Sequence, residues 1–343
     1  MWKTTTAPIG DNPPTATTAY GTHVLDALKQ LPDHSVHAVI TQPPTWQKRL
    51  LEGAGFPPHW SSVVYAPMCD MARIAIEDGT YHLGTELKVQ DYIGHLIAVF
   101  REVKRVLRKD GTIWVLVKEN RAHNAKVNEA NSIENKNLYG CPHRFALAMQ
   151  ADGWIWRSSP IWHETNRLPN HGDRPTDVHH HFFFGAHPES RGEYYYDVDS
   201  IRESHTSLHR PPGNKKTEVA EGFARRPIGD EAFHPKGRNK RSVFAVPHGC
   251  WPGMQEGPWP RELIAPLVTA SVPAGGTVLD PFAGSGAVAE VAMAQGKNFI
   301  GIDINPGAED ELMRRLNGVR PPTKAKKRAP QNNPVADMFE ERP

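Results

Sequence analysis

The chain has 343 residues, of which 38% are hydrophobic, so it is long enough for one large α/β domain with insertions. Its formal net charge is only +2, and no overall electrostatic field therefore demands a nucleic-acid partner, although a local basic surface is compatible with this value. Isolated cysteines (Cys69, Cys141 and Cys250) argue against a disulfide framework, and no apolar run is long enough to cross a bilayer, so the composition predicts a cytoplasmic protein without a membrane partner.

The first half of the chain predicts alternating helices and strands. Residues 1–18 are expected to be a flexible N-terminal arm, since they are rich in Thr and Pro and lack apolar periodicity. After it the pattern predicts helices at 24–31, 91–107 and 142–151, and strands at 36–41, 112–117, 155–162 and 178–185. Helix–turn–strand units of this kind are typical of α/β proteins, and we assign residues 19–186 to the first half of such a core.

The apolar periodicity fails between His187 and Arg241. From Arg202 to Arg241 ten Lys or Arg residues stand against five acids, a local excess of +5. A basic segment of this kind fits a DNA-contacting region, but a solvated loop has the same composition.

The C-terminal part resumes the α/β pattern. A helix is expected at 260–270, a strand at 277–279, a helix at 287–295 and a strand at 298–304, so residues 246–319 form the second half of the core. The basic, proline-rich residues 320–343 are predicted to be a disordered tail.

The segment VLDPFAGSG, ending at Gly286, predicts a strand, a glycine turn and the start of a helix. Gly284 and Gly286 allow the backbone to approach a ligand closely, and the helix directs its N–H groups at that turn. The next strand ends in Asp303, seventeen residues past Gly286, roughly where doubly wound folds place an acid that binds ribose hydroxyls. Because GxGxxG and P-loop patterns are missing, a nucleoside-type cofactor is favoured over a phosphate-bound nucleotide.

The segment TQPPTW, Thr41–Trp46, follows the buried strand at 36–41. Its two prolines stiffen the backbone and leave carbonyl groups available. An exocyclic amino group of a base is a poor nucleophile because its lone pair is delocalised into the ring. Oxygen atoms that accept both of its hydrogens would draw the nitrogen towards tetrahedral geometry and stabilise the charge that develops on attack. Gln42-Pro43-Pro44 offers such acceptors, although a proline turn without chemistry shows the same pattern.

Together these loops make the chain resemble the β-order amino-methylating DNA methyltransferases, in which a [DNS]-PP-[YFW] loop comes first and a DPFxGxG loop lies near the C-terminus. The resemblance covers roughly Gly21–Leu316 and includes FREVKRVLRKDGTIWV, RPTDVHHHFFF and DPFAGSGAVAEVAMAQGKNFIGIDINP. It implies a circularly permuted, seven-stranded Rossmann-like α/β sheet. It also implies direct methyl transfer from S-adenosylmethionine (SAM) to a flipped base of double-stranded DNA.

The same resemblance implies roles for individual residues. Those expected at the cofactor are Asp280, Phe282, Gly284, Ser285, Gly286, Asp303 and Asn305. Those expected at the base are Gln42, Pro43, Pro44 and Trp46. Residues 187–245 would be a target-recognition insertion, with DNA contacts from Lys215, Lys216, Arg225, Arg226, Lys236, Arg238, Lys240 and Arg241. The resemblance leaves open a homodimer and a restriction endonuclease partner.

The chain departs from the family pattern at three places. Gln42 stands where Asp, Asn or Ser is usual, and Gly21-Thr22 replaces a common Gly-Asp. Thr45 stands where an aromatic residue stacks on the base, so we expect the neighbouring Trp46 to take that role. Cytosine N4 is the favoured target because the loop context is most like the SPPYW subgroup, and adenine N6 is the alternative because Gln carries an amide as Asn does. A catalytically impaired homologue that only binds SAM and DNA is a further alternative.

The run His179-His180-His181 invites a metal-binding interpretation. Adjacent residues of a strand point to opposite faces, so these three side chains cannot converge on one ion. We therefore predict a half-buried strand and no metal site. Trp154, Trp156 and Trp162 are predicted to be core or sheet-surface residues rather than a platform for stacked bases.

Overall fold

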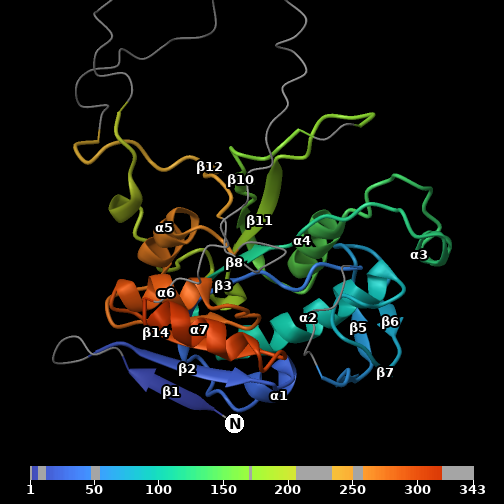
Figure 1. The fold of residues 1–343 in the computed structure, drawn as a ribbon, viewed down its shortest axis with the longest axis horizontal. Coiled ribbons are helices and arrows are strands. Elements are labelled where there is room, and N and C mark those ends of the chain that lie inside the picture. Colours follow the sequence, from blue (N-terminus) through green and yellow to red (C-terminus); the bar gives the residue numbers. More distant parts are fainter. Residues whose placement is uncertain are drawn as a thin grey trace, which may run out of the picture.

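The computed structural model describes residues 2–6, 13–47, 55–169, 172–205, 234–249 and 258–318. Within these ranges ten strands form one sheet in the order β1-β2-β14-β13-β3-β8-β11-β10-β12, with β9 paired to β11 (Figure 1). None of the described helices is both long and apolar enough to traverse a bilayer.

The centre of the sheet is parallel. It contains, in spatial order, β2 (Thr15–Tyr20), β14 (Asn298–Asp303), β13 (Thr277–Asp280), β3 (Val36–Thr41) and β8 (Leu107–Leu116). Alternate side chains of β8 enter different cores: Ile113 and Val115 pack on one face, whereas Trp114 packs on the other. A strand buried on both faces needs apolar residues at nearly every position, which explains the unbroken run TIWVL.

Antiparallel strands extend both ends of this centre. They are β1 (Lys3–Thr6) beside β2, then β11 (His179–Ala186) beside β8, and β9 (Ile155–Ser158) and β10 (Ile161–His163) beside β11. The last strand, β12 (Val243–Ala245), is parallel to β10. Two small two-stranded antiparallel sheets lie apart from the main sheet, β4 (His59–Trp60) with β7 (Gly79–Thr80), and β5 (Val63–Tyr65) with β6 (Ile74–Ile76).

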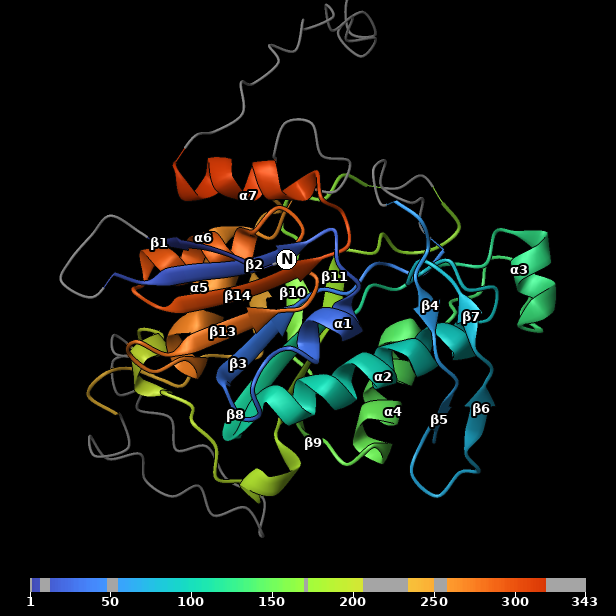
Figure 2. The same ribbon diagram turned by 90° about the horizontal axis from the view of Figure 1, so that it is seen from below.

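Helices cover both faces of the sheet, which gives a three-layer α/β architecture (Figure 2). One face carries α1 (Val24–Leu28), α2 (Val89–Val106) and α4 (Cys141–Ala151). The other carries α5 (Arg261–Ser271), α6 (Ala287–Ala294) and α7 (Ala308–Leu316). The remaining helical segments are α3 (Ala125–Ala130) and the 3-10 turns η1 (Pro188–Ser190) and η2 (Asp199–Ile201).

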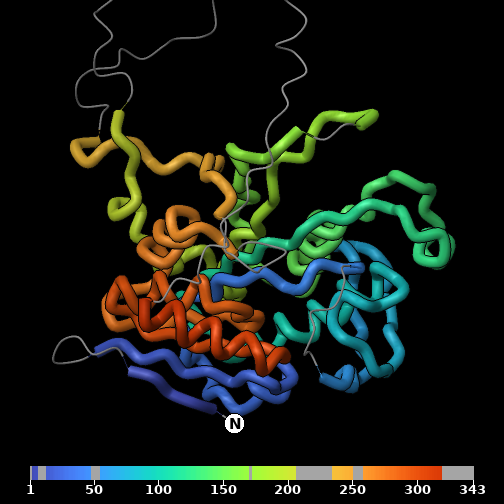
Figure 3. The backbone as a smooth tube through the Cα atoms, viewed as in Figure 1, coloured from blue at the N-terminus to red at the C-terminus, as the bar shows by residue number. Residues whose placement is uncertain are grey.

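The N-terminal residues differ from the expectation of a flexible arm. Lys3–Thr6 and Thr15–Tyr20 are strands, and β2 pairs in parallel with β14 from near the C-terminus. The blue and red ends of the tube accordingly run side by side (Figure 3). The physical reason is that both faces of β2 are covered, with Ala16 buried on one face and Ala19 on the other, and that its threonines have high strand propensity. The described sheet has ten strands in total, whereas seven were expected.

Two other boundaries also differ. The strand expected at 155–162 is divided into β9 and β10, because Pro160 lies between them and cannot donate to a strand ladder. Parts of the insertion expected at 187–245 belong to the core, since Tyr194 and Tyr196 pack against it and β12 joins the sheet. The tail at 320–343 lies outside the described residues.

Candidate functional site

The two loops singled out in the sequence lie next to each other at the carboxyl ends of β3 and β13. These strands are parallel neighbours, with Val39 paired to Leu279. At the end of β3 the Thr41 hydroxyl donates to Asp280 Oδ1, at the end of β13, over 2.5 Å. This hydrogen bond joins two residues that are 239 positions apart, and each of the two loops begins at the next residue, Gln42 or Pro281. Ligands of open parallel sheets bind at this edge, where loops from neighbouring strands diverge.

The glycine turn after β13 has the conformation that the sequence predicts. Gly284 has φ +49° and Gly286 has φ +77°, both in the left-handed region that favours glycine. A Cβ added at Gly286 would lie 2.1 Å from Leu312 Cδ1, so close packing against α7 requires glycine there. A Cβ at Gly284 would meet nothing within 4 Å, which leaves space beside the turn on that side. The α6 helix begins directly after Gly286.

Asp303, at the end of β14, organises the same turn. Its Oδ2 accepts from the Gly284 N–H and its Oδ1 from the Asn305 N–H, each over 2.8 Å. Burial raises the pKa of Asp303, and the two backbone N–H groups oppose that shift. A carboxylate has about four lone-pair sites, so both oxygens can still accept hydrogens from a ligand. This acceptor and the open space at Gly284 fit a nucleoside cofactor whose ribose hydroxyls donate hydrogen bonds.

Asp280 sits deeper than Asp303. Its Oδ1 accepts from Thr41 and also from the Phe282 N–H, over 3.1 Å. Burial raises the pKa of Asp280 to about 7, although these hydrogen bonds favour the charged form. Phe282 is partly exposed beside the turn, whereas Ser285 is buried. Asp280 therefore connects the glycine turn after β13 to the end of β3.

In the loop after β3 the two proline carbonyls differ. The Pro44 carbonyl accepts from the Tyr92 hydroxyl over 2.8 Å. The Pro43 carbonyl receives no hydrogen bond from any residue that the structure describes. The side-chain oxygen of Gln42 accepts from the indole N–H of Trp259 over 2.6 Å. Two oxygens were predicted to accept hydrogens from an amino group. The Pro43 carbonyl oxygen keeps both of its lone pairs for this task, and the Gln42 side-chain oxygen keeps one.

The expectation that Trp46 stacks on the base is wrong. Its side chain is 0% exposed and packs edge-on against Tyr139, with ring centroids 4.6 Å apart. Its indole N–H donates to the Glu86 carbonyl over 2.8 Å, and its own carbonyl accepts from Asn120. Trp46 stabilises the fold because its ring fills the core and its indole N–H satisfies the Glu86 carbonyl. It therefore supports the loop from the core side.

A buried polar layer under the loop was not predicted. The Glu86 carboxylate accepts from His95 Nδ1 over 2.8 Å and from the Gly84 N–H over 2.7 Å, and both side chains are fully buried. The Glu86 carbonyl accepts from Trp46 and also from Gln47 Nε2. In the sequence, His95 stands in the apolar stretch YIGHLI, whereas Glu86 is flanked by polar residues such as Thr85 and Lys88. This pattern identifies neither their pairing nor their position under TQPPTW.

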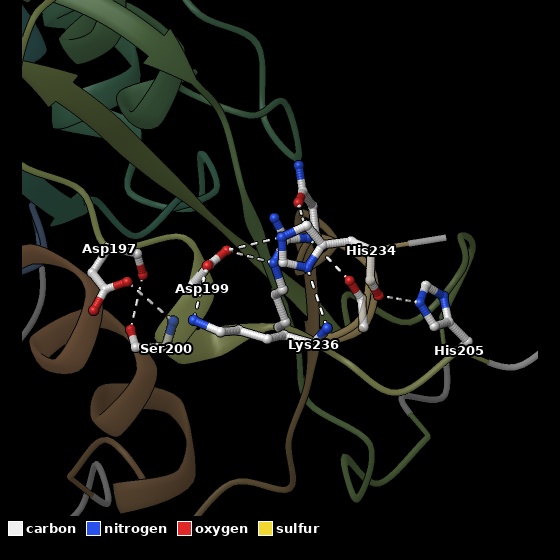
Figure 4. Close-up of polar contacts among 9 residues, drawn as sticks. Asp197, Asp199, Ser200, His205, His234 and Lys236 are labelled. Atoms are coloured by element: carbon white, nitrogen blue, oxygen red, sulfur yellow. Dashed lines mark hydrogen bonds and ion pairs between the residues drawn. The ribbon is translucent and has the colours of Figure 1, made fainter. Parts of the chain in front are cut away.

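The basic residues predicted to contact DNA divide into two groups. Lys215, Lys216, Arg225 and Arg226 lie outside the described residues. Lys236, Arg238, Lys240 and Arg241 are described, and each forms an ion pair with Asp199 or Glu203. Lys236 Nζ lies 3.1 Å from Asp199, which is also close to His234 (Figure 4). Arg238, Lys240 and Arg241 surround Glu203, and a β-bridge joins Glu203 to Arg238. These contacts join the described residues that precede position 206 to those that follow position 233.

The three consecutive histidines of β11 lie on alternate faces. His180 Nε2 is 2.9 Å from Glu164, whereas the rings of His179 and His181 approach each other with centroids 5.1 Å apart. The described residues contain no group of three or more side chains arranged to hold a metal ion.

Comparison with known proteins gives a consistent result. A family model described as a DNA methylase, covering N6- and N4-methyltransferases, matches residues 36–314. The chain is 31% identical over 312 residues to the type II methyltransferase M.Cfr9I of Citrobacter freundii, with 86% of this chain and 85% of the relative covered. It is 28% identical over 313 residues to the type II methyltransferase M.SmaI of Serratia marcescens, with 84% and 88% covered.

Solved structures share the fold. The PvuII DNA methyltransferase, described as cytosine-N4-specific, aligns with a TM-score of 0.54 and 13% identity over 88% of this chain and 93% of that one. The DNA modification methylase TTHA0409 of Thermus thermophilus, solved with S-adenosyl-L-methionine, aligns with a TM-score of 0.52 and 20% identity over 88% and 93%. The chain belongs to the N6/N4 DNA methylase family and is a SAM-dependent DNA amino-methyltransferase.

Proposed function

We propose that this enzyme methylates N4 of a flipped cytosine in double-stranded DNA, at the edge where Thr41 and Asp280 join the two loops. The observation that carries the proposal is their 2.5 Å hydrogen bond, which brings the acceptor loop of β3 beside the cofactor turn of β13. Adenine N6 is the alternative target. In chain order the acceptor loop precedes the cofactor turn, which supports a circularly permuted arrangement.

The chain's own residues have separate tasks in this proposal. Asp303 accepts hydrogens from the ribose hydroxyls, and the absence of a side chain at Gly284 leaves room for the methionine part. The Pro43 carbonyl and the Gln42 side-chain oxygen accept the two hydrogens of the target amino group, so that its lone pair is directed away from the ring. SAM, when bound, supplies an electrophilic methyl group on a sulfonium. Preorganised acceptors stabilise the positive charge that develops on nitrogen without reorganising during the reaction.

The DNA-facing part of the proposal concerns residues 187–245. The ion pairs of Asp199 and Glu203 support the base of this segment, and the excess of basic residues favours a role in target recognition. The type II methyltransferase relatives make a restriction endonuclease with the same recognition site the expected functional partner.

One experiment tests the proposal directly. The pure protein is incubated with unmethylated duplex DNA and SAM carrying a deuterated methyl group, the DNA is digested to nucleosides, and the products are analysed by mass. We expect labelled N4-methylcytidine. Labelled N6-methyladenosine would assign the alternative base, and neither product in a protein that binds both ligands would support the catalytically impaired homologue.

A further inference from the structure

The contact between Gln42 and Trp259 has a chemical consequence beyond packing. Trp259 lies between Pro258 and Pro260, immediately before α5, and is only 8% exposed. Its ring packs edge-on against Phe182, with centroids 5.3 Å apart, so the indole is held in place. An indole N–H can only donate a hydrogen bond. The atom of Gln42 that lies 2.6 Å from it must therefore be the carboxamide oxygen and not the nitrogen.

This orientation determines what Gln42 can offer to a base. A carboxamide oxygen has two lone pairs, and Trp259 occupies one of them. The amide nitrogen, Nε2, has no hydrogen-bond partner among the residues that the structure describes. One acceptor site and two donor hydrogens thus remain on a group whose rotation is restricted. Without Trp259 the amide could turn over and exchange the positions of oxygen and nitrogen.

We propose that Trp259 is a positioning residue that makes Gln42 a bidentate reader of the amino edge of the target base. The Gln42 oxygen accepts from the exocyclic amino group, and Nε2 donates to the neighbouring ring nitrogen. Cytosine presents such a donor–acceptor pair at N4 and N3, and adenine at N6 and N1. A carboxamide matches a donor–acceptor pair of this kind with two parallel hydrogen bonds. This inference rests on the proposed function, in which Gln42 faces the flipped base.

The same geometry rejects the other two bases. Thymine and guanine carry a carbonyl oxygen where the amino group stands, next to a ring N–H. Each of their groups would meet a Gln42 group of the same kind, acceptor against acceptor and donor against donor. Leaving buried polar groups unpaired is costly, so a fixed carboxamide discriminates more strongly than a freely rotating one. An ionised Asp, one of the three residues usual at this position in the family, has no donor, so relative to Asp the Gln42 side chain adds a contact to the ring nitrogen.

The test combines two protein variants with a substrate analogue. The substrates are duplexes that contain either the natural target base or its deaza analogue, 3-deazacytosine or 1-deazaadenine, in which C–H replaces the ring nitrogen. The variants are Gln42→Glu, whose carboxylate cannot donate, and Trp259→Phe, which keeps the ring but loses the N–H. Initial methylation rates and equilibrium dissociation constants for DNA are measured with both substrates, and circular dichroism checks that each variant is folded.

In the parent we expect the analogue to reduce kcat/KM about tenfold or more, since Nε2 then loses its acceptor. The analogue ratio is defined as kcat/KM for the natural base divided by kcat/KM for the deaza analogue. In Gln42→Glu and in Trp259→Phe this ratio should fall to within about threefold of unity, and the corresponding ratio of DNA dissociation constants should fall with it. Trp162→Phe is the matched control. Its fully buried indole donates to the Val246 carbonyl, in the same core cluster but away from Gln42, so its analogue ratio should equal that of the parent.

The outcomes separate the inference from the function on which it rests. If the parent methylates the natural base but all four proteins show the same analogue ratio, bidentate reading by Gln42 is excluded. If only Gln42→Glu loses the ratio, Gln42 reads the ring nitrogen but Trp259 does not position it, and the proposal is again overturned. If the parent methylates neither cytosine nor adenine in the natural duplex, the proposed function itself has failed.

Discussion

The proposed cofactor side and the proposed base side of the site are built in different ways. On the cofactor side, consecutive residues form the turn: β13 ends, two glycines turn the chain and α6 begins. Only two side chains from elsewhere bind Gly284 among the described residues, Asp303 at its N–H and Tyr20 at its carbonyl. On the base side, the loop after β3 depends on residues from elsewhere in the chain. Tyr92 binds the Pro44 carbonyl, Glu86 binds the Trp46 indole, and Trp259 binds Gln42.

This difference predicts how each side responds to substitution. A turn formed mainly by local backbone geometry is more sensitive to changes in its glycines than to most changes elsewhere in the chain. A loop supported by buried side chains is sensitive to residues that never contact the substrate, because positioning within about 1 Å affects catalysis strongly. The base side should therefore carry the larger effects.

The largest effect is expected in the buried layer under the loop. Glu86→Ala removes the acceptor for both His95 and the Gly84 N–H, and breaking a buried pair by removing one partner costs about 3–5 kcal/mol. Chemical denaturation should show a loss of this size in the free energy of unfolding. Glu309→Ala is the control, since its ion-pair partner Lys3 is 66% exposed, and a pair that reaches solvent in this way contributes about 0–1 kcal/mol. Equal losses in the two variants would contradict a supporting role for Glu86.

Gln42→Ala should reduce turnover by on the order of 100-fold, because it removes an acceptor preorganised for the transition state. SAM affinity should barely change, since Gln42 lies in the loop of β3 and not in the cofactor turn. Single-turnover rates and calorimetry distinguish these quantities. A variant that methylates DNA as fast as the parent would leave the Pro43 carbonyl as the only gripping oxygen in the loop.

Asp303→Ala should act on the other side of the site. Hydrogen bonds to a charged group contribute about 1.5–3 kcal/mol, so SAM affinity should fall roughly 10- to 100-fold while DNA affinity stays the same. Asp303 also holds the Gly284 and Asn305 N–H groups, so Asp303→Asn is a useful second variant that preserves the side-chain shape. Calorimetry with unchanged SAM affinity in both folded variants would remove Asp303 from the ribose site.

Sequence reasoning succeeded where the signal was local. The turn VLDPFAGSG, the strands on either side of it and the α2–β8 unit follow from periodicity and glycine chemistry. The resemblance to a family gave the cofactor and the reaction class. The parallel pairing of β3 with β13 then places the two predicted loops together.

It failed where position depends on long-range packing. Trp46 and Trp259 are both aromatic residues next to proline-rich turns, and nothing in the local sequence distinguishes them. The fold buries Trp46 under the loop and places the Trp259 indole against Gln42. The N-terminal arm was misjudged for a similar reason, since Thr- and Ala-rich strands are stable only when another strand, here β14, is available to pair with.

The smallest effects are expected from the exposed cations at the base of the insertion. A phosphate contact changes the slope of log affinity against log salt by about 0.9. Lys236 and Arg241 have side chains 64% and 68% exposed, but Asp199 and Glu203 already bind them, so part of any gain from a phosphate is lost with the ion pair. Neutralising both should therefore lower the slope by less than about 1.8, twice the value for one contact, and Lys215 with Lys216 provides a matched double substitution. Glu203→Gln sharpens the test. It weakens the hold on Arg238, Lys240 and Arg241 together, so the slope should become steeper if these residues then bind phosphates. The slope could stay unchanged both in Glu203→Gln and after neutralising Lys236 and Arg241. In that case these two residues, with Arg238 and Lys240, only stabilise the fold through their ion pairs, and other residues contact DNA.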